Sequence, residues 1–358
     1  MPETFTLSEL TIPGTYIRVS AEGLVTAGAI STGNIGIVGT AAEADEETHV
    51  FSDYATARSE VGEYDEFNAG AGSQNLTRGL ELLYRNRGRT VFARAVAEGA
   101  TQTDFQDAFA ELIKDDVNIL VAPELSTDAA ISVLGSVVGS AQDAGRDIIA
   151  VVGSDATTVS DIIDQVPSNH RIVFVAPGIQ AFDAAAEEPV NLPGTYSGAA
   201  VAGLISTLAP QTSPTNKVLS GVTRLAQRFS YGETVQLVNA GVLVLEERRG
   251  VRVVRGLTTD DGPFRQVTTR RITDFAKAGI RSVSNQFVGR LNNQRVRGAL
   301  QGALDGFLTT MVLDEQLVTY TVEVTATRQD EIAGRAMVNA VIQPTFSIDF
   351  VAVTLVLE

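Results

Sequence analysis

Five short apolar runs, with helical patterns between them, limit the folds open to this chain. The runs lie at residues 35–38, 91–96, 119–122, 148–152 and 172–175. Each is a near-continuous apolar series, which is typical of strands that are covered on both faces. Helical patterns lie between the runs, for example at 76–84 and 105–113. Residues 29–177 are therefore predicted to form an α/β unit with a largely parallel sheet.

The middle of the chain indicates a boundary and then a return to β-structure. Residues 189–214 are rich in Pro, Gly, Ser and Thr and contain one helix of small residues. We place the domain boundary in this stretch, between residues 195 and 196. Apolar runs on both sides of Arg249-Gly250 then favour a β-hairpin.

The next hundred residues predict an α+β unit that ends near residue 343. Apolar residues recur at helical spacing over 272–291 and again over 296–311, so we expect two amphipathic helices. Alternating apolar residues at 318–324 and a run at 337–342 predict two strands.

Both ends of the chain are predicted to form strands outside the compact body. Near the start, the turn signal Pro13-Gly14 precedes a short apolar run at 16–19. After Pro344, a candidate strand over 348–357 carries apolar residues on both of its faces. Such a terminal strand must be covered by another element, and it is the clearest sign of oligomerisation in the sequence.

Residues 248–297 are basic in an otherwise acidic chain. They contain twelve Arg and Lys residues but only three Asp residues, whereas the whole chain has a net charge of -16. This contrast suggests a surface for an acidic partner.

No pattern in the sequence indicates an active site, a cofactor or a metal. The chain has no Cys and only two His residues, of which we expect His170 to be an ordinary loop residue. Gly153-Ser154-Asp155 follows a strand and favours a helix N-cap at Ser154 or Asp155 over a ligand site. Asp260-Asp261-Gly262 is typical of a turn. We expect no enzyme activity.

No apolar run approaches the ~20 residues that would span a bilayer, and the start lacks the pattern of a secretory signal. We therefore expect synthesis in the cytoplasm and no stable membrane insertion.

Several segments taken in order carry a resemblance to a known family. They include Pro13-Gly14-Thr15-Tyr16-Ile17, the stretch 76–96, Val201-Ala202-Gly203-Leu204, Pro214-Thr215-Asn216-Lys217, Asn239-Ala240-Gly241-Val242 and Arg270-Arg271-Ile272. Their order and spacing resemble the contractile tail sheath family of contractile-tailed phages, R-type bacteriocins and related injection systems. The resemblance covers nearly the whole chain.

The resemblance implies a structural subunit that polymerises as a helical stack of rings around an inner tube and contracts. It implies an N-terminal arm at 1–25, an α/β sheath domain at 26–195, a C-terminal domain facing the tube at 196–343 and an arm strand at 344–358. The implied partners are other copies of the chain, the inner tube protein, and baseplate and tail terminator proteins. The subunit would reside in a virion tail or an assembled injection particle.

In the family, terminal arms add strands to the C-terminal-domain sheets of neighbouring subunits, which is β-augmentation. The residues expected to make these contacts are Ile12, Tyr16, Ile17, Val19, Ile348, Phe350, Val351, Val353, Leu355 and Leu357.

For the basic segment, we hypothesise that part of the helical region faces an acidic tube through Lys277, Arg281, Arg290, Arg295 and Arg297. The alternative is that these residues pair with acidic residues, such as Asp45 or Glu66, of adjacent sheath subunits.

Two other classes of function remain as alternatives. A nucleic-acid-binding protein would use the same segment 248–297, although that segment lacks interleaved aromatic residues and any known reader motif. An α/β enzyme built on residues 29–180 would need a ligand site that no motif indicates.

Overall fold

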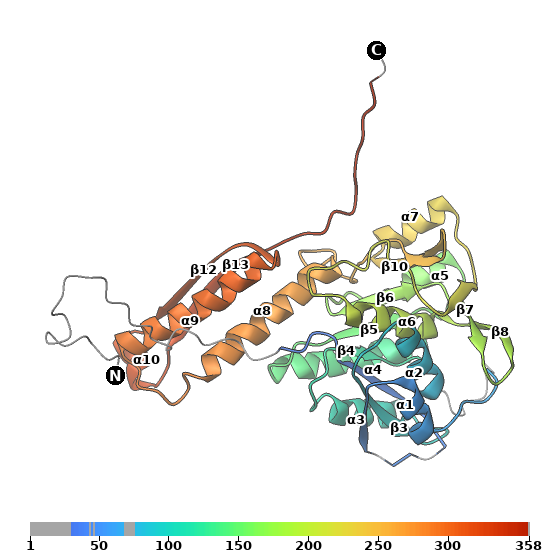
Figure 1. The fold of residues 1–358 in the computed structure, drawn as a ribbon, viewed down its shortest axis with the longest axis horizontal. Helices are drawn as coiled ribbons and strands as arrows, with labels where there is room; N and C mark the ends of the chain where they lie inside the picture. Colours follow the sequence, from blue (N-terminus) through green and yellow to red (C-terminus); the bar gives the residue numbers. More distant parts are fainter. Residues whose placement is uncertain (1–29, 43, 46, 68–75, 357–358) are drawn as a thin grey trace, which may run out of the picture. The chain divides into compact units, whose positions relative to one another are not determined.

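The computed structural model describes residues 30–42, 44–45, 47–67 and 76–356 (Figure 1). The chain divides into two compact units. The large unit comprises Ser31–Phe275 and Thr345–Glu358, and the small unit comprises Met1–Ile30 and Ala276–Pro344. The predicted N-terminal arm, with Ile12, Tyr16, Ile17 and Val19, lies outside the described residues, as does Leu357.

An eight-stranded sheet with the order β11-β10-β6-β5-β4-β1-β3-β2 forms the centre of the large unit. Its strands are β1 (Ile35–Thr40), β2 (Thr48–Phe51), β3 (Val91–Val96), β4 (Ile119–Val121), β5 (Ile149–Gly153), β6 (Ile172–Ala176), β10 (Val242–Glu247) and β11 (Val251–Val253). Within this sheet, β10, β6, β5, β4, β1 and β3 run parallel to one another, whereas the edge strands β2 and β11 are antiparallel to their neighbours. The five apolar runs are therefore strands of a mostly parallel sheet, as predicted.

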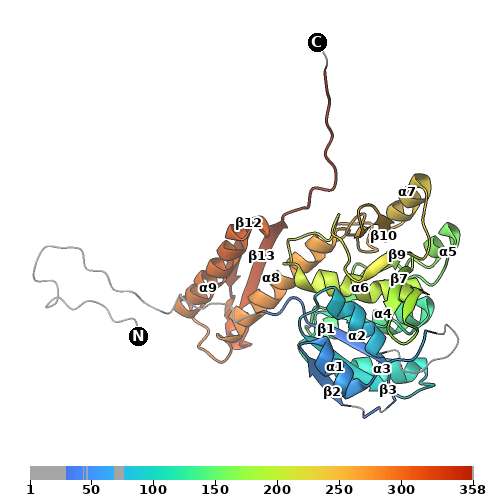
Figure 2. The same cartoon turned by 45° about the vertical axis from the view of Figure 1, so that its right-hand side comes forward.

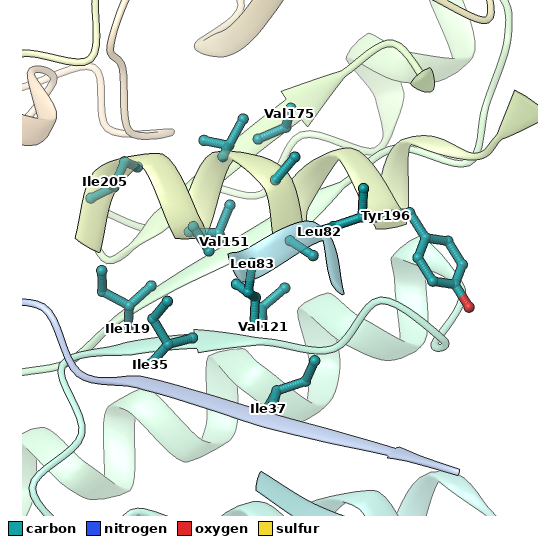
Figure 3. Packing of buried hydrophobic residues seen from close by; sticks show 14 of the residues in the cluster. Ile35, Ile37, Leu82, Leu83, Ile119, Val121, Val151, Val175, Tyr196 and Ile205 are labelled. Atoms are coloured by element: carbon teal, nitrogen blue, oxygen red, sulfur yellow. The ribbon is translucent and has the colours of Figure 1, made fainter. Parts of the chain in front are cut away.

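Helices cover both faces of this sheet, which explains why its strands are apolar throughout. One face packs against α1 (Tyr54–Val61), α2 (Leu76–Arg85) and α6 (Gly194–Thr207). The other packs against α3 (Gln102–Leu112), α4 (Thr127–Asp143), α5 (Val159–Asp164) and α7 (Tyr231–Asn239). Figure 3 shows the first layer, where Leu83 and Ile205 meet the strand residues Ile35 and Ile119. Successive residues of each strand point to opposite faces of the sheet, so alternate residues pack against the two helix layers.

Helix α6 lies unusually close to the sheet because its residues are small. A Cβ atom at Gly153 of β5 would lie only 1.6 Å from the carbonyl oxygen of Gly194, at the start of α6. The predicted boundary between residues 195 and 196 falls inside this buried helix. The following strands β10 and β11 complete the central sheet, and the division lies between Phe275 and Ala276. The small residues of α6, which lie in the stretch where the sequence suggests a domain boundary, allow this close packing.

A second, three-stranded antiparallel sheet completes the large unit. It contains β7 (Ile179–Asp183), β8 (Glu188–Leu192) and β9 (Val222–Leu225) in the order β8-β7-β9. A buried ion pair fixes it to α2, because Arg78 Nη1 lies 2.6 Å from Asp183 Oδ2. The Arg78 guanidinium also lies 4.2 Å from the centre of the Tyr64 ring.

The small unit is built from two helices and a hairpin. Helix α8 (Val267–Asn285) enters it at Ala276, and α9 (Gln294–Leu313) follows. Strands β12 (Leu317–Thr325) and β13 (Met337–Pro344) form a two-stranded antiparallel sheet beside α9 (Figure 2). The short helix α10 (Arg328–Ile332) connects the two strands in sequence. Both helices and both strands match the predicted α+β pattern, although α8 starts and ends earlier than predicted.

The hairpin predicted around Arg249-Gly250 is present, since β10 and β11 pair antiparallel on either side of it. By contrast, residues 345–356 form no strand. A strand needs a partner for its backbone N–H and C=O groups, and among the described residues this segment has no neighbouring strand.

The close approach of α6 to β5 yields a first prediction. Gly153→Ala should lower the free energy of unfolding by about 3 kcal/mol or more, because the added methyl group meets backbone atoms that cannot move away independently. Gly139→Ala is the matched control. Gly139 is exposed inside α4 with nothing within 4 Å of an added Cβ. This change should raise the free energy of unfolding by ~0.5–1 kcal/mol.

Urea unfolding of the monomer, followed by circular dichroism, measures the free energy of unfolding of both variants. Equal changes in the two variants would contradict the close packing of α6 on β5.

Candidate assembly surfaces

The Gly153-Ser154-Asp155 segment has a structural role that differs from the predicted N-cap. Helix α5 is capped by Thr158, not by Ser154 or Asp155. Asp155 Oδ2 instead accepts a hydrogen bond of 3.1 Å from the backbone N–H of Thr127, the first residue of α4. Its Oδ1 accepts one of 2.8 Å from Gln165. The segment therefore holds α4 and α5 to the carboxyl end of β5.

Glu124 and Thr40 meet at the point where the strand order changes direction, between β1 and β4. Ligands of open α/β sheets bind at such points. Here the Glu124 carboxylate accepts hydrogen bonds of 2.9 Å from the Thr40 N–H and of 2.6 Å from the Thr40 hydroxyl. Burial raises the pKa of Glu124 to about 7. The carboxylate is thus used to join β1 to the loop after β4.

His170 lies in a loop, as predicted, and packs against the Phe264 ring at 5.3 Å. Burial, followed by the nearby Arg270 and Arg171 charges, lowers its pKa. Asp260 stabilises a turn, since its Oδ2 accepts a hydrogen bond of 2.9 Å from the N–H of Phe264. Among the described residues, no cluster of three or more Asp, Glu and His side chains could hold a metal ion. In the same part of the chain, no helix is long and apolar enough to cross a membrane.

The basic segment 248–297 is divided between the two units. Its first part belongs to the large unit and its second part to the small unit. Several arginines of the first part are bonded within the chain: Arg248 to Glu246, Arg252 to Asn216, Arg255 to Asp349, Arg265 to the carbonyls of Val238 and Asn239, and Arg270 to Asp274. These side chains stabilise the large unit, and the charge count of the sequence overstated the free positive surface.

Arg271 is the clearest case of an internal role. Its guanidinium donates hydrogen bonds to the carbonyls of Leu208 at 2.8 Å, Ala209 at 3.3 Å and Thr32 at 3.0 Å. Leu208 is the C-cap of α6, so a cation lies at the negative end of that helix. Burial lowers the pKa of Arg271 to about 10.

The second part of the basic segment is more exposed. Arg281, Arg290 and Arg295 are exposed, whereas Lys277 and Arg297 are half-buried. Arg297 Nη1 lies 3.0 Å from Glu331 Oε1, and Arg290 packs over the Phe287 ring. Residues 276–344 contain seven basic and six acidic side chains, against 27 and 43 in the whole chain. The small unit is thus nearly neutral on an acidic protein.

A pocket of about 250 Å³ lies at the turn between α8 and α9. Phe287, Leu300 and Val338 form part of its apolar lining, and Arg290 and Arg297 are among its polar residues. The exposed side chains of Val288 and Leu291 border it.

Two features of the C-terminal region leave strand-forming groups without cover. The two-stranded sheet of β12 and β13 has no further strand beside either edge among the described residues. Residues 345–356 expose large apolar side chains: Phe346, Ile348, Phe350, Val351, Val353, Leu355 and Val356. In contrast, the side chain of Asp349 in the same segment is only 6% exposed. The sequence prediction of contact residues missed Asp349, although a single carboxylate within an apolar run can indicate a specific polar contact.

These surfaces belong to a fold and a sequence pattern with known relatives. Residues 98–259 match the family model of the phage tail sheath protein central domain, and residues 259–358 match that of the phage tail sheath C-terminal domain. The chain belongs to the phage tail sheath protein family. The family resemblance predicted from the sequence is thereby confirmed. A search of curated protein sequences finds no match.

Solved structures place this sheath family member near the contractile injection systems in fold. A chain of the anti-feeding prophage baseplate matches with a TM-score of 0.75 and 18% identity, covering 97% of this chain and 99% of that one. A chain of the PVC sheath complex in the contracted state, from an extracellular contractile injection system, gives 0.74 and 17%, with 99% of both chains covered. The sheath tail protein of Listeria innocua gives 0.70 and 13%, covering 92% of this chain and 95% of that one. At these identities, the likeness shows the fold alone.

The Glu124–Thr40 contact predicts a pH-dependent contribution to the stability of the monomer. The unfolded-state pKa of Glu124 is 4.5 and the folded-state pKa is about 7, so burial of the ionised form costs free energy. This cost is absent below pH 4.5 and is fully present above pH 7. Relative to Glu124→Gln, the wild type should therefore lose about 3 kcal/mol as the pH rises through this window.

Unfolding by urea between pH 4.5 and 8 measures this difference, and Glu98→Gln at an exposed position is the control. A wild-type-minus-variant difference that stays constant with pH would show that Glu124 is not destabilised by burial.

Proposed function

We propose that this chain is the structural subunit of a contractile sheath, which polymerises as a helical stack of rings around an inner tube and contracts to drive that tube through a target envelope. The observation that carries the proposal is the apolar, exposed segment 345–356, together with a β12–β13 sheet that has no further strand at either edge among the described residues. Membership of the sheath family supports it. The subunit would be made in the cytoplasm and reside in a virion tail or an injection particle.

In this proposal, the terminal arms of one subunit add strands to the β12–β13 sheet of its neighbours. The side chains of Phe350, Val351, Val353 and Leu355 are exposed, and a second copy would bury them. Each backbone hydrogen bond contributes ~0.5–1.5 kcal/mol net, and each large apolar side chain ~1.5–3 kcal/mol. A strand of eight residues would therefore hold two subunits together while weaker contacts around it exchange.

Contraction requires no catalytic group in the subunit. Heterologous contacts between identical subunits generate open helical polymers. If the extended polymer has weaker interfaces than the contracted one, the difference in interface free energy drives the transition. The proposed partners at the two ends of the polymer are baseplate and tail terminator proteins.

The inner tube is the proposed partner of the small unit, through Lys277, Arg281, Arg290, Arg295 and Arg297. Exposure favours Arg281, Arg290 and Arg295 for this contact, because Lys277 and Arg297 are half-buried. Charge complementarity sets register with little buried apolar area, so the contact can be released during firing. Pairing with acidic residues of adjacent sheath subunits, such as Asp45 or Glu66, is the other use of these cations.

The rival nucleic-acid function has lost much of its basis, because many arginines of the segment 248–275 are bonded inside the large unit. No observation favours it over the sheath function.

Removal of residues 350–358 should prevent polymerisation and leave the monomer folded. The exposed apolar residues of this segment contribute little to the stability of the single chain, so the thermal midpoint should change by less than about 3 °C. Negative-stain microscopy and sedimentation compare the variant with the wild type, which should form hollow striated cylinders. Cylinders formed equally well by the truncated chain would refute strand exchange by this arm.

Reversal of charge at the exposed arginines should weaken co-assembly with an acidic tube. The double variant Arg290→Glu, Arg295→Glu should reduce tube incorporation about tenfold or more at physiological salt. Arg328→Glu is the matched control, since Arg328 is also exposed in the small unit and lies in the short helix α10. Co-sedimentation with purified tube protein measures incorporation. Normal incorporation with impaired sheath polymerisation would assign these arginines to sheath–sheath contacts.

A further inference from the structure

One short stretch of the otherwise exposed C-terminal segment is held firmly by its own subunit. Ile348 and Val351 are 82% and 79% exposed, whereas the side chain of Asp349 is only 6% exposed. Polar residues inside an apolar run would weaken an arm that served only to bury apolar surface. Their contacts indicate a separate role.

Asp349 binds three side chains of the large unit. Its Oδ2 accepts hydrogen bonds from Arg255 Nε at 2.7 Å and from Gln266 Nε2 at 2.9 Å. Its Oδ1 lies 3.4 Å from Thr215 Oγ1. The Arg255 side chain is 20% exposed, so this ion pair is shielded from water on most sides and is stronger than a surface pair.

Ser347 is held by the same glutamine. Its backbone N–H donates to Gln266 Oε1 at 2.9 Å, and its carbonyl accepts from Gln266 Nε2 at 3.2 Å. The side-chain amide of Gln266 thus satisfies both backbone groups of Ser347, as a neighbouring strand would. The hydroxyl groups of Ser347 and Thr268 lie 3.1 Å apart. The contacts of the Asp349 carboxylate, the Ser347 backbone and the Ser347 hydroxyl together fix the direction of residues 347–349.

The receiving surface is itself tied to the large unit. The N–H of Gly256 donates to Thr215 Oγ1 at 2.9 Å, and the N–H of Asn216 donates to the carbonyl of Val253 in β11 at 2.8 Å. Leu257 and Gln266 form an isolated β-bridge. The groups that bind Asp349 are therefore positioned by the central sheet, so a force on the arm would reach the core of the large unit.

We propose that Asp349, with Arg255 and Gln266, is an anchor that fixes where the exchangeable part of the arm begins. Residues up to Asp349 stay with their own subunit. The exposed Phe350 ring lies 5.1 Å from the Arg255 guanidinium, and the strand that pairs with a second copy begins at this residue. Asp349 is then a positioning residue for strand exchange, and this inference rests on the proposed sheath function. It also removes Ile348, between two held residues, from the exchanged strand.

The physical benefit of the anchor is a lower cost of assembly. Ordering a free chain costs ~1–2 kcal/mol of conformational entropy per residue. Residues 347–349 are ordered before the neighbour arrives, and the following residues leave the subunit from a fixed point. This raises the effective concentration of the arm at the site on the neighbouring copy.

The test uses the full chain with Asp349→Asn, which keeps the shape of the side chain but removes its charge. The control is Asp261→Asn, a change at an exposed residue of the same unit. The rescue variant exchanges the two charges, as Asp349→Arg with Arg255→Asp. Hydrogen exchange of the Ser347 N–H is measured below the assembly concentration, and the critical concentration for polymerisation is measured by sedimentation.

In Asp349→Asn, we expect exchange at Ser347 to be about tenfold faster and the critical concentration to rise about five- to tenfold, with a thermal midpoint close to that of the wild type. The double variant with swapped charges should restore part of the protection at Ser347 and part of the assembly. Asp261→Asn should change neither the exchange rate at Ser347 nor the critical concentration. Unchanged polymerisation in Asp349→Asn would overturn the anchor. A lower critical concentration would also overturn it, because the contact would then restrain the arm.

Failure of the anchor and failure of the sheath function give different results. If chains lacking residues 350–358 polymerise normally, strand exchange itself is wrong. If those chains fail to polymerise while Asp349→Asn behaves like the wild type, only the anchor is wrong. The exchange rate at Ser347 reports on the contact in the monomer in either case.

Discussion

A β-strand has two edges of hydrogen-bonding groups and two faces of side chains, and each of them needs a partner. The large unit meets this need internally, since helices cover both faces of its central sheet and its strands pair from β2 to β11. The C-terminal region does not: among the described residues, β12 and β13 pair only with each other and residues 345–356 have no strand partner. The requirement that is met in the central sheet is therefore unmet at the end of the chain, where we propose that a second copy meets it.

Charge in this protein is used mainly to join its elements. Arg78 fixes the second sheet to α2 through Asp183, and Arg255 holds the C-terminal segment through Asp349. Buried pairs of this kind contribute little net stability but are costly to break, so they specify which elements lie together. The exposed cations of the small unit are a separate set, which we propose for an outside partner.

The central sheet could be predicted from the sequence because strands covered on both faces are recognisable as uninterrupted apolar runs. The membership of β10 in this sheet could not be predicted, since no local pattern shows which strand will lie beside Val242. The small residues of α6 predict a helix but also suggest a domain boundary, whereas the contact of Gly194 with Gly153 shows that they serve close packing. The role of Arg271 depends on carbonyl groups that are distant in sequence, and positive charge alone does not show where a guanidinium points. Asp349 could have been noticed as a carboxylate in an apolar run, but its partners could not.

The three carbonyls bound by Arg271 have a consequence for how the large unit opens. Helix α6 ends without a glycine cap, and its last carbonyls depend on a side chain from the start of α8. The same guanidinium holds Thr32, just before β1. Local fraying at one of these places removes an acceptor from a buried cation, which costs free energy and favours opening of the three places together. A single side chain thereby makes the entry to the sheet, the end of α6 and the start of α8 one cooperative unit of unfolding.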